Sequence, residues 1–123
     1  PSVYLGSVGE MNDAAADIQL RVSKNNLAAN EAIGYTLSFE STQQLNNQYR
    51  MRASGTERMV PYQILVGGRE VLPDSVRRGT VSAGAGTADV VNIQFKLSGR
   101  QTRGIAAGAT LQDTITAVIT PDS

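Results

Sequence analysis

The sequence predicts an all-β protein folded as an antiparallel sandwich or barrel. Six segments alternate apolar and polar residues with a period of two, and turn residues separate them at short intervals. A third observation excludes a helical fold, because no segment of helix length repeats its apolar residues with a helical period. The alternating segments are 17–23, 34–41, 48–53, 59–66, 91–98 and 113–120.

Each of these strands is expected to bury the apolar side of its alternation. Tyr35, Leu37 and Phe39 make 34–41 the expected anchor of the core, because aromatic side chains bury large areas. Arg50 and Arg52 share one side of their strand, which is therefore expected to meet water. The other expected inward residues are Ile18, Leu20, Val22, Tyr49, Met51, Ala53, Val60, Tyr62, Ile64, Val66, Val91, Ile93, Phe95 and Leu97.

Glycine and proline mark the ends of strands. Gly67 and Gly68 follow 59–66 directly and predict a tight hairpin with 69–72 as its second arm, because such turns need positive φ. Pro61 cannot donate a ladder hydrogen bond, so it is expected near a strand end or at a sheet edge.

Three stretches between the strands are expected to be loops. The segment 24–31 is one, with a short helix over 27–32 as the alternative, and 99–110 is another. The region 75–88 has the weakest pattern, and 82–87 within it is rich in small residues. Interpreted as a phosphate-binding loop, 82–87 lacks the Lys-Ser/Thr ending and the helix that should follow.

The two ends of the chain pose a question about sheet completeness. The last strand directs Ile115, Ala117 and Ile119 to one side, and only three residues follow Thr120. If the sheet needs a further strand, that strand must come from the N-terminus or from another molecule. The segment 1–11 is either a frayed arm or such a strand, with apolar residues at positions 3 and 5.

The bulk composition favours one ordinary globular domain over 1–123. The 11 basic residues balance the 11 acidic ones, so charge gives no case for nucleic acid or an anionic membrane as a partner. No apolar run is long enough for membrane insertion, and no basic-then-apolar leader opens the chain. We therefore expect a cytosolic protein, or a mature one whose leader has been removed.

The residue types present argue against catalysis. The chain has no histidine and no cysteine, which removes the commonest general base, the commonest zinc ligand and any disulfide. We expect no enzyme, no metal and no cofactor. A glycosidase-like carboxylate pair is the one enzymatic alternative, although few aromatic residues are left to line a sugar cleft. The carboxylates considered are Glu40, Glu57, Glu70, Asp74, Asp89 and Asp113.

Asp113 has a more specific expected role. It lies directly before the Thr-rich last strand, where an aspartate accepts backbone N–H groups and fixes how the chain enters the strand. That role is structural rather than catalytic.

The end of the chain resembles a known family. The segment 107–120, AGATLQDTITAVIT, is similar to the closing motif of bacterial chaperone–usher pilins, in which small-Gly-x-Tyr-x-Asp-Thr leads into a last alternating strand. The best likenesses are the spore coat protein U-like (archaic) and colonisation-factor-like (alternate) classes. Their Gly-Tyr-x-Leu-x-x-x-Ser strand matches 34–41, and their Ile/Val-Pro-Tyr strand with its glycine turn matches 60–72. Leu111 stands in for the usual tyrosine, with the spacing from the motif's glycine one residue longer.

The resemblance implies an immunoglobulin-like sandwich that is incomplete and is completed by a donor strand. It implies a structural subunit of an extracellular bacterial fimbria, exported through the periplasm, with a chaperone, an outer-membrane usher and copies of itself as partners. Val3 and Leu5 are then the donor candidates in an N-terminal arm, 1–11. The acceptor-groove candidates are Ile115, Ala117 and Ile119, with Ile18, Leu20 and Val22 as the other wall.

Other interpretations stay open on the sequence alone. All of these apolar residues are ordinary core if the domain is complete. A complete sandwich is then a self-contained module, either a pilus-tip adhesin domain or a carbohydrate-binding domain. A viral or phage structural subunit is the remaining alternative.

Overall fold

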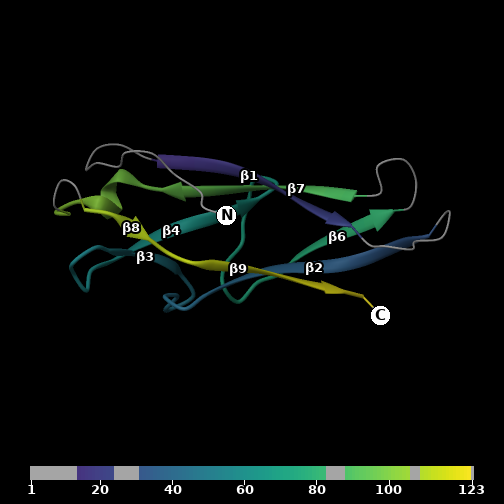
Figure 1. The fold of residues 1–123 in the computed structure, drawn as a ribbon, viewed down its shortest axis with the longest axis horizontal. Helices are drawn as coiled ribbons and strands as arrows, with labels where there is room; N and C mark the ends of the chain where they lie inside the picture. Colours follow the sequence, from purple (N-terminus) through teal and green to yellow (C-terminus); the bar gives the residue numbers. More distant parts are fainter. Residues whose placement is uncertain (1–13, 24–30, 83–87, 106–108, 123) are drawn as a thin grey trace.

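The computed structural model describes residues 14–23, 31–82, 88–105 and 109–122, which form two antiparallel sheets packed face to face (Figure 1). The larger sheet has the order β1 (Ala14–Ser23), β7 (Ala88–Leu97), β4 (Met59–Val66), β3 (Tyr49–Ala53) and β8 (Leu111–Gln112), with β5 (Arg69–Glu70) paired to β4. The smaller sheet has the order β6 (Arg77–Ser82), β2 (Ala32–Ser41) and β9 (Ile115–Pro121). The described residues contain one short 3₁₀ turn, η1 (Gly99–Thr102), and no α-helix. The predicted all-β antiparallel sandwich is confirmed.

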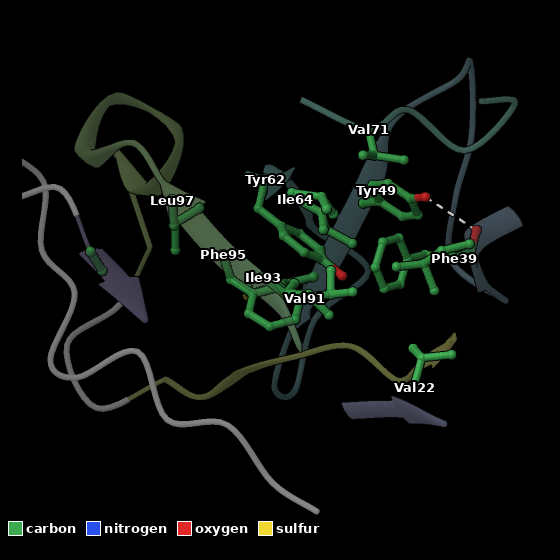
Figure 2. Packing of buried hydrophobic residues seen from close by; sticks show 14 of the residues in the cluster. Val22, Phe39, Tyr49, Tyr62, Ile64, Val71, Val91, Ile93, Phe95 and Leu97 are labelled. Atoms are coloured by element: carbon green, nitrogen blue, oxygen red, sulfur yellow. Dashed lines mark hydrogen bonds between the residues drawn. The ribbon is translucent and has the colours of Figure 1, made fainter. Parts of the chain in front are cut away.

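One apolar core fills the space between the sheets. Every second residue is buried along β3 and β4, over 35–39 of β2 and over 91–97 of β7, as their alternation predicts. Figure 2 shows the rings of Phe39, Tyr49 and Phe95 within this cluster, and the rings of Tyr49 and Tyr62 lie 6.0 Å apart between centroids. The Tyr49 hydroxyl donates to the backbone carbonyl of Phe39 at 3.1 Å, so the core also ties β3 to β2.

The glycine and proline predictions are confirmed by the ladders around β4. Gly67 and Gly68 have φ of +58° and +85°, and β5 turns back onto the end of β4. The Gly67 N–H donates to Asn92 O at 3.2 Å, and from there hydrogen-bonded pairs alternate down to Gln63 opposite Lys96. The next residue whose N–H should donate toward β7 in that alternation is residue 61, and this residue is Pro61, which has no N–H. The β4–β7 ladder therefore ends there.

Strand β6 is a correction to the sequence prediction, which treated 75–88 as weakly structured. It pairs along β2 with Tyr35 opposite Gly79, and Val81 is its one fully buried apolar residue. A Cβ on Gly79 would overlap the Tyr35 ring, so the glycine leaves the space that the ring occupies. The strand was not predicted because it has too few apolar residues to show an alternation with a period of two.

Several boundaries also differ from the prediction. The last strand begins at Ile115 and not at 113, because 111–112 form a separate short strand in the other sheet. Ala32 begins β2, which excludes the end of the alternative helix 27–32, and residues 27–30 of that helix lie outside the described residues. The loop expected at 99–110 contains η1. The stretch 83–87 also lies outside the described residues.

Candidate functional site at the free edge of the last strand

Strand β9 lies at the edge of the smaller sheet, and β2 is its only partner among the described strands (Figure 1). The Asp122 N–H donates to Gly34 O at 2.8 Å, which marks these two residues as a hydrogen-bonded pair. Such pairs alternate along an antiparallel ladder. The backbone groups of 116, 118 and 120 therefore point toward β2. Those of Ile115, Ala117 and Ile119 point away from β2, to the side that we call the free edge.

The same three residues direct their side chains toward the core side of the sheet. They lie opposite Ser41, Phe39 and Leu37 of β2, and directly opposite residues share a side. Leu37 and Phe39 are buried, with 1% and 2% of their surface exposed, whereas Ile119 is 39% exposed and Ala117 is exposed too. Ile115 is half-buried against the core. The core side of β9 is thus only partly covered.

The other predicted wall lies in the larger sheet. Ile18 and Leu20 of β1 are half-buried against the core, and Val22 is buried. Strand β1 is the edge of its own sheet and pairs with β7, so β1 and β9 are edges of two different sheets. The donor candidates Val3 and Leu5 lie outside the described residues.

Charged side chains distinguish the three long edges of the described sheets. Strand β1 carries Asp17 and Arg21, both exposed, and β6 carries Arg77 and Arg78. Strand β9 carries no charged residue between Ile115 and Pro121. Charges on an edge strand are a common protection against pairing with another chain. Of the three edges, that of β9 lacks this protection.

The start of β9 is fixed by Asp113, which accepts hydrogen bonds from both sheets. Its Oδ1 accepts from the Thr114 backbone N–H at 2.9 Å, from the Ser41 hydroxyl at 2.7 Å and from Gln43 Nε2 at 3.0 Å. Its Oδ2 accepts from the Tyr62 hydroxyl at 2.5 Å. The predicted bond to a backbone N–H is confirmed. The bonds from Ser41 and Tyr62 could not be predicted from the sequence, because they connect segments that lie far apart along the chain.

A second tyrosine–aspartate bond joins the two sheets elsewhere. The Tyr35 hydroxyl on β2 donates to Asp89 Oδ2 on β7 at 2.5 Å. Burial, with this hydrogen bond to the carboxylate, raises the pKa of Tyr35 to about 12. Burial and the bond to Asp113 likewise raise the pKa of Tyr62 far above its ordinary value. Both hydroxyls therefore stay protonated and keep donating at neutral pH.

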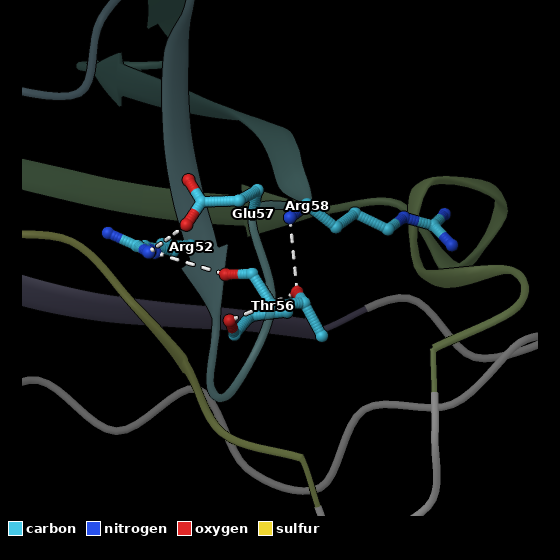
Figure 3. Close-up of polar contacts among 5 residues, drawn as sticks. Arg52, Thr56, Glu57 and Arg58 are labelled. Atoms are coloured by element: carbon cyan, nitrogen blue, oxygen red, sulfur yellow. Dashed lines mark hydrogen bonds and ion pairs between the residues drawn. The ribbon is translucent and has the colours of Figure 1, made fainter.

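An open corner of about 590 Å³ lies near Asp113, lined by parts of 42–43, 52–57 and 110–114. Its polar groups largely bond to one another. Figure 3 shows Arg52 pairing with Glu57 at 2.8 Å and donating to the Thr56 carbonyl at 3.1 Å. The Arg58 N–H donates to the Thr56 hydroxyl at 3.0 Å in the same hairpin. No aromatic side chain lines this corner.

The described residues contain no group of three or more His, Cys, Asp or Glu residues placed to hold a metal ion. They also contain no helix with the length and apolar character needed to cross a bilayer.

Comparison with known proteins identifies the fold. No protein-family model and no curated protein sequence matches the chain. Among solved structures, the chain is similar to a protein of a chaperone–tip adhesin complex of CFA/I fimbriae biogenesis, with a TM-score of 0.51 and 11% identity. The match covers 100% of this chain and 39% of that chain, so this chain spans well under half of its neighbour's length. The likeness shows the fold: the chain is an antiparallel β-sandwich of the immunoglobulin-like kind.

Proposed function

We propose that this protein is a structural subunit of a bacterial surface pilus or fimbria that polymerises by donor-strand exchange. The observation that carries the proposal is the free edge of β9. Its backbone groups point outward, its core-side residues Ala117 and Ile119 are exposed, and it carries no charge. A strand added there forms ladder hydrogen bonds and covers those side chains in one step. The fimbrial-type fold of the structural neighbour supports the proposal.

The donor in this proposal is the N-terminal arm, 1–11, of a neighbouring copy, with Val3 and Leu5 as its inserted residues. The acceptor residues are Ile115, Ala117 and Ile119, and the second wall consists of Ile18, Leu20 and Val22. Each chain then offers one donor and one acceptor. A contact between two different surfaces repeats head to tail and produces a linear filament when it does not close into a ring.

The exposed edge of β9 needs protection before assembly. An uncharged edge strand with exposed apolar residues pairs readily with the wrong chain, so it must be covered before assembly. The resemblance to chaperone–usher pilins implies a periplasmic chaperone and an outer-membrane usher as transient partners, with the cell surface as the destination, and we include both partners in the proposal. The role is structural and requires no catalysis and no cofactor.

The proposal is tested with the full chain and a synthetic peptide that copies residues 1–11. The chain alone is expected to form linear oligomers in light scattering and in negative-stain images. The double variant V3D/L5D, whose own arm is disabled, is expected to be monomeric. Adding the peptide at about 100 times its Kd then raises the melting temperature by about 10 °C.

A peptide carrying the same two substitutions is the matched control and should have no effect. A wild-type chain that is monomeric, with a melting temperature indifferent to the wild-type peptide, contradicts the proposal. Closed particles in the images favour a viral or phage structural protein instead. A monomer that binds glycans favours a self-contained adhesin or carbohydrate-binding module.

A further inference from the structure

Basic side chains gather on one part of the molecule, although the chain as a whole is neutral. The segments 49–66 and 94–104 together carry six arginine or lysine residues and one acidic residue, Glu57. These segments are neighbours in the larger sheet, because β4 pairs with β3 on one side and with β7 on the other. The six cations, which we call the basic surface, are Arg50, Arg52, Arg58, Lys96, Arg100 and Arg103.

The register of the larger sheet places cations on both sides of β4. Pro61 and Gln63 point to the outer side of the sheet, since they alternate with buried residues. Arg50 of β3 lies opposite Pro61, and Arg52 follows it on the same side of that strand. Lys96 of β7 lies opposite Gln63. Directly opposite residues share a side, so these cations flank the outer side of β4 from two strands about 10 Å apart.

Backbone carbonyls hold arginines of the basic surface in place. Arg50 Nε donates to the Gln43 carbonyl at 2.7 Å. Arg58 Nη2 donates to the Gln101 carbonyl at 3.3 Å, which connects the β3–β4 hairpin to η1. In Figure 3 the side chains of Arg52 and Arg58 leave this hairpin in opposite directions, so the positive charge is spread over the surface. Side chains that are fixed before a partner binds lose less conformational entropy on binding.

This spread of charge fits an extended polyanion. One exposed ion pair contributes little in water, so useful affinity requires several pairs that form together. The open corner near Asp113 adjoins the basic surface through Arg52, and the Gln112 amide and the Thr114 hydroxyl line it too. Such groups form hydrogen bonds with the hydroxyls of a sugar chain. No aromatic side chain lines the corner to stack on a nucleic-acid base.

We propose that the basic surface binds an anionic polysaccharide. Its sulfate or carboxylate groups pair with the arginine side chains, whose planar forks match such oxyanions. Its hydroxyls meet the polar groups of the adjoining corner. This binding is separate from polymerisation, because the basic surface lies on the larger sheet and the free edge belongs to β9 in the smaller sheet. A polymerised subunit therefore keeps the basic surface available.

The test measures the Kd of a labelled heparin oligosaccharide by fluorescence anisotropy. The protein is the full V3D/L5D chain, so that polymerisation does not add avidity. Lys96→Gln/Arg100→Gln removes two exposed cations of the basic surface. It is expected to raise the Kd about tenfold at about 0.1 M salt and to weaken the salt dependence of binding.

The matched control is Arg21→Gln/Arg69→Gln, which removes the same charge from two exposed residues outside the basic surface. Its Kd should change by less than about twofold, because charges further than a Debye length from the ligand are screened. Circular dichroism melting verifies that both double variants are folded. All four substituted side chains are exposed, so the fold should tolerate their loss.

Three results would overturn the proposal. The first is that heparin does not bind the V3D/L5D chain. The second is an equal loss of affinity in the two double variants, which would mean that heparin responds to total charge and not to the basic surface. The third is duplex DNA binding as tightly as heparin, which would make the partner a nucleic acid. None of these results bears on strand addition at β9, because the measurement uses a chain whose donor arm is disabled.

Discussion

At the scale of single residues, two tyrosine–aspartate bonds connect the sheets of a chain that has no cysteine. Tyr35 reaches from the smaller sheet to Asp89 in the larger one, and Tyr62 reaches from the larger sheet to Asp113 at the start of β9. Hydrogen bonds to an ionised acceptor are stronger than those between neutral groups. These two bonds therefore help to hold the sheets in one fixed arrangement, and Asp113 also fixes where β9 starts.

Asp113→Ala is expected to lower the free energy of unfolding by about 2–3 kcal/mol, because it leaves the buried Tyr62 hydroxyl without its acceptor. Urea denaturation measures the loss. Asp122→Ala is the control: Asp122 is exposed and lies 3.7 Å from Arg78, so its removal should cost less than about 1 kcal/mol. Adding Tyr62→Phe to Asp113→Ala should recover part of the loss. Equal stability of Asp113→Ala and the wild type would show that the carboxylate does not hold the strand.

The tyrosines also predict a dependence on alkaline pH. The pKa of Tyr35 and that of Tyr49 are each raised from 10.0 to about 12, mainly by burial. Between these values the folded chain holds protons that the unfolded chain has released, so stability falls as pH rises through this window and is unaffected by these groups below pH 10. Urea midpoints measured across this range, with tyrosinate absorbance as the titration signal, test the prediction. A flat midpoint up to pH 12 would contradict it.

At the scale of elements, the pairing of β2 with β6 depends on one small residue. The ring of Tyr35 occupies the place that a side chain on Gly79 would need. Gly79→Ala is therefore expected to destabilise the protein by about 1–3 kcal/mol through crowding in a packed site. Thr80→Ala, on the exposed side of the same strand, is the matched control and should cost less than about 0.5 kcal/mol. Thermal melting of both variants tests this prediction. A Gly79→Ala melting temperature equal to that of the wild type would mean that the Tyr35 ring moves aside without cost.

The same pairing explains what the sequence could and could not reveal. All six alternating segments formed strands, because a strand with one buried side must place apolar residues at every second position. In β6 the inward positions are Arg77, Gly79 and Val81, which give no such pattern. The bonds at Asp113 were hidden for a different reason. Its partners Ser41 and Tyr62 lie 72 and 51 residues away, and only the folded topology brings them together.

At the scale of the whole molecule, the sequence located the last strand but not what sets its edge apart. That property appears only when the edges are compared, since β1 and β6 carry charges and β9 does not. Which strands are edges depends on the pairing of all the others. The edge of β9 is therefore a property of the assembled sheets, and its consequence is an assembly prediction.

If each chain carries one donor and one acceptor, the two halves of the contact can be disabled separately. Ile119→Lys places a charge on the acceptor edge at a residue that is already 39% exposed, so the fold should tolerate it while strand addition fails. V3D/L5D disables the donor arm and leaves that edge intact. Each variant alone is expected to be monomeric in light scattering.

Mixing these two variants is the decisive measurement. The intact arm of the Ile119→Lys chain fills the intact edge of the V3D/L5D chain, and neither partner can then extend the complex. The mixture should therefore give one-to-one dimers and nothing larger. A contact in which both chains use the same surface behaves differently, because one damaged surface then impairs the mixed pair as much as it impairs the variant alone. Larger oligomers in the mixture, or no dimer at all, would exclude a head-to-tail filament built through this edge.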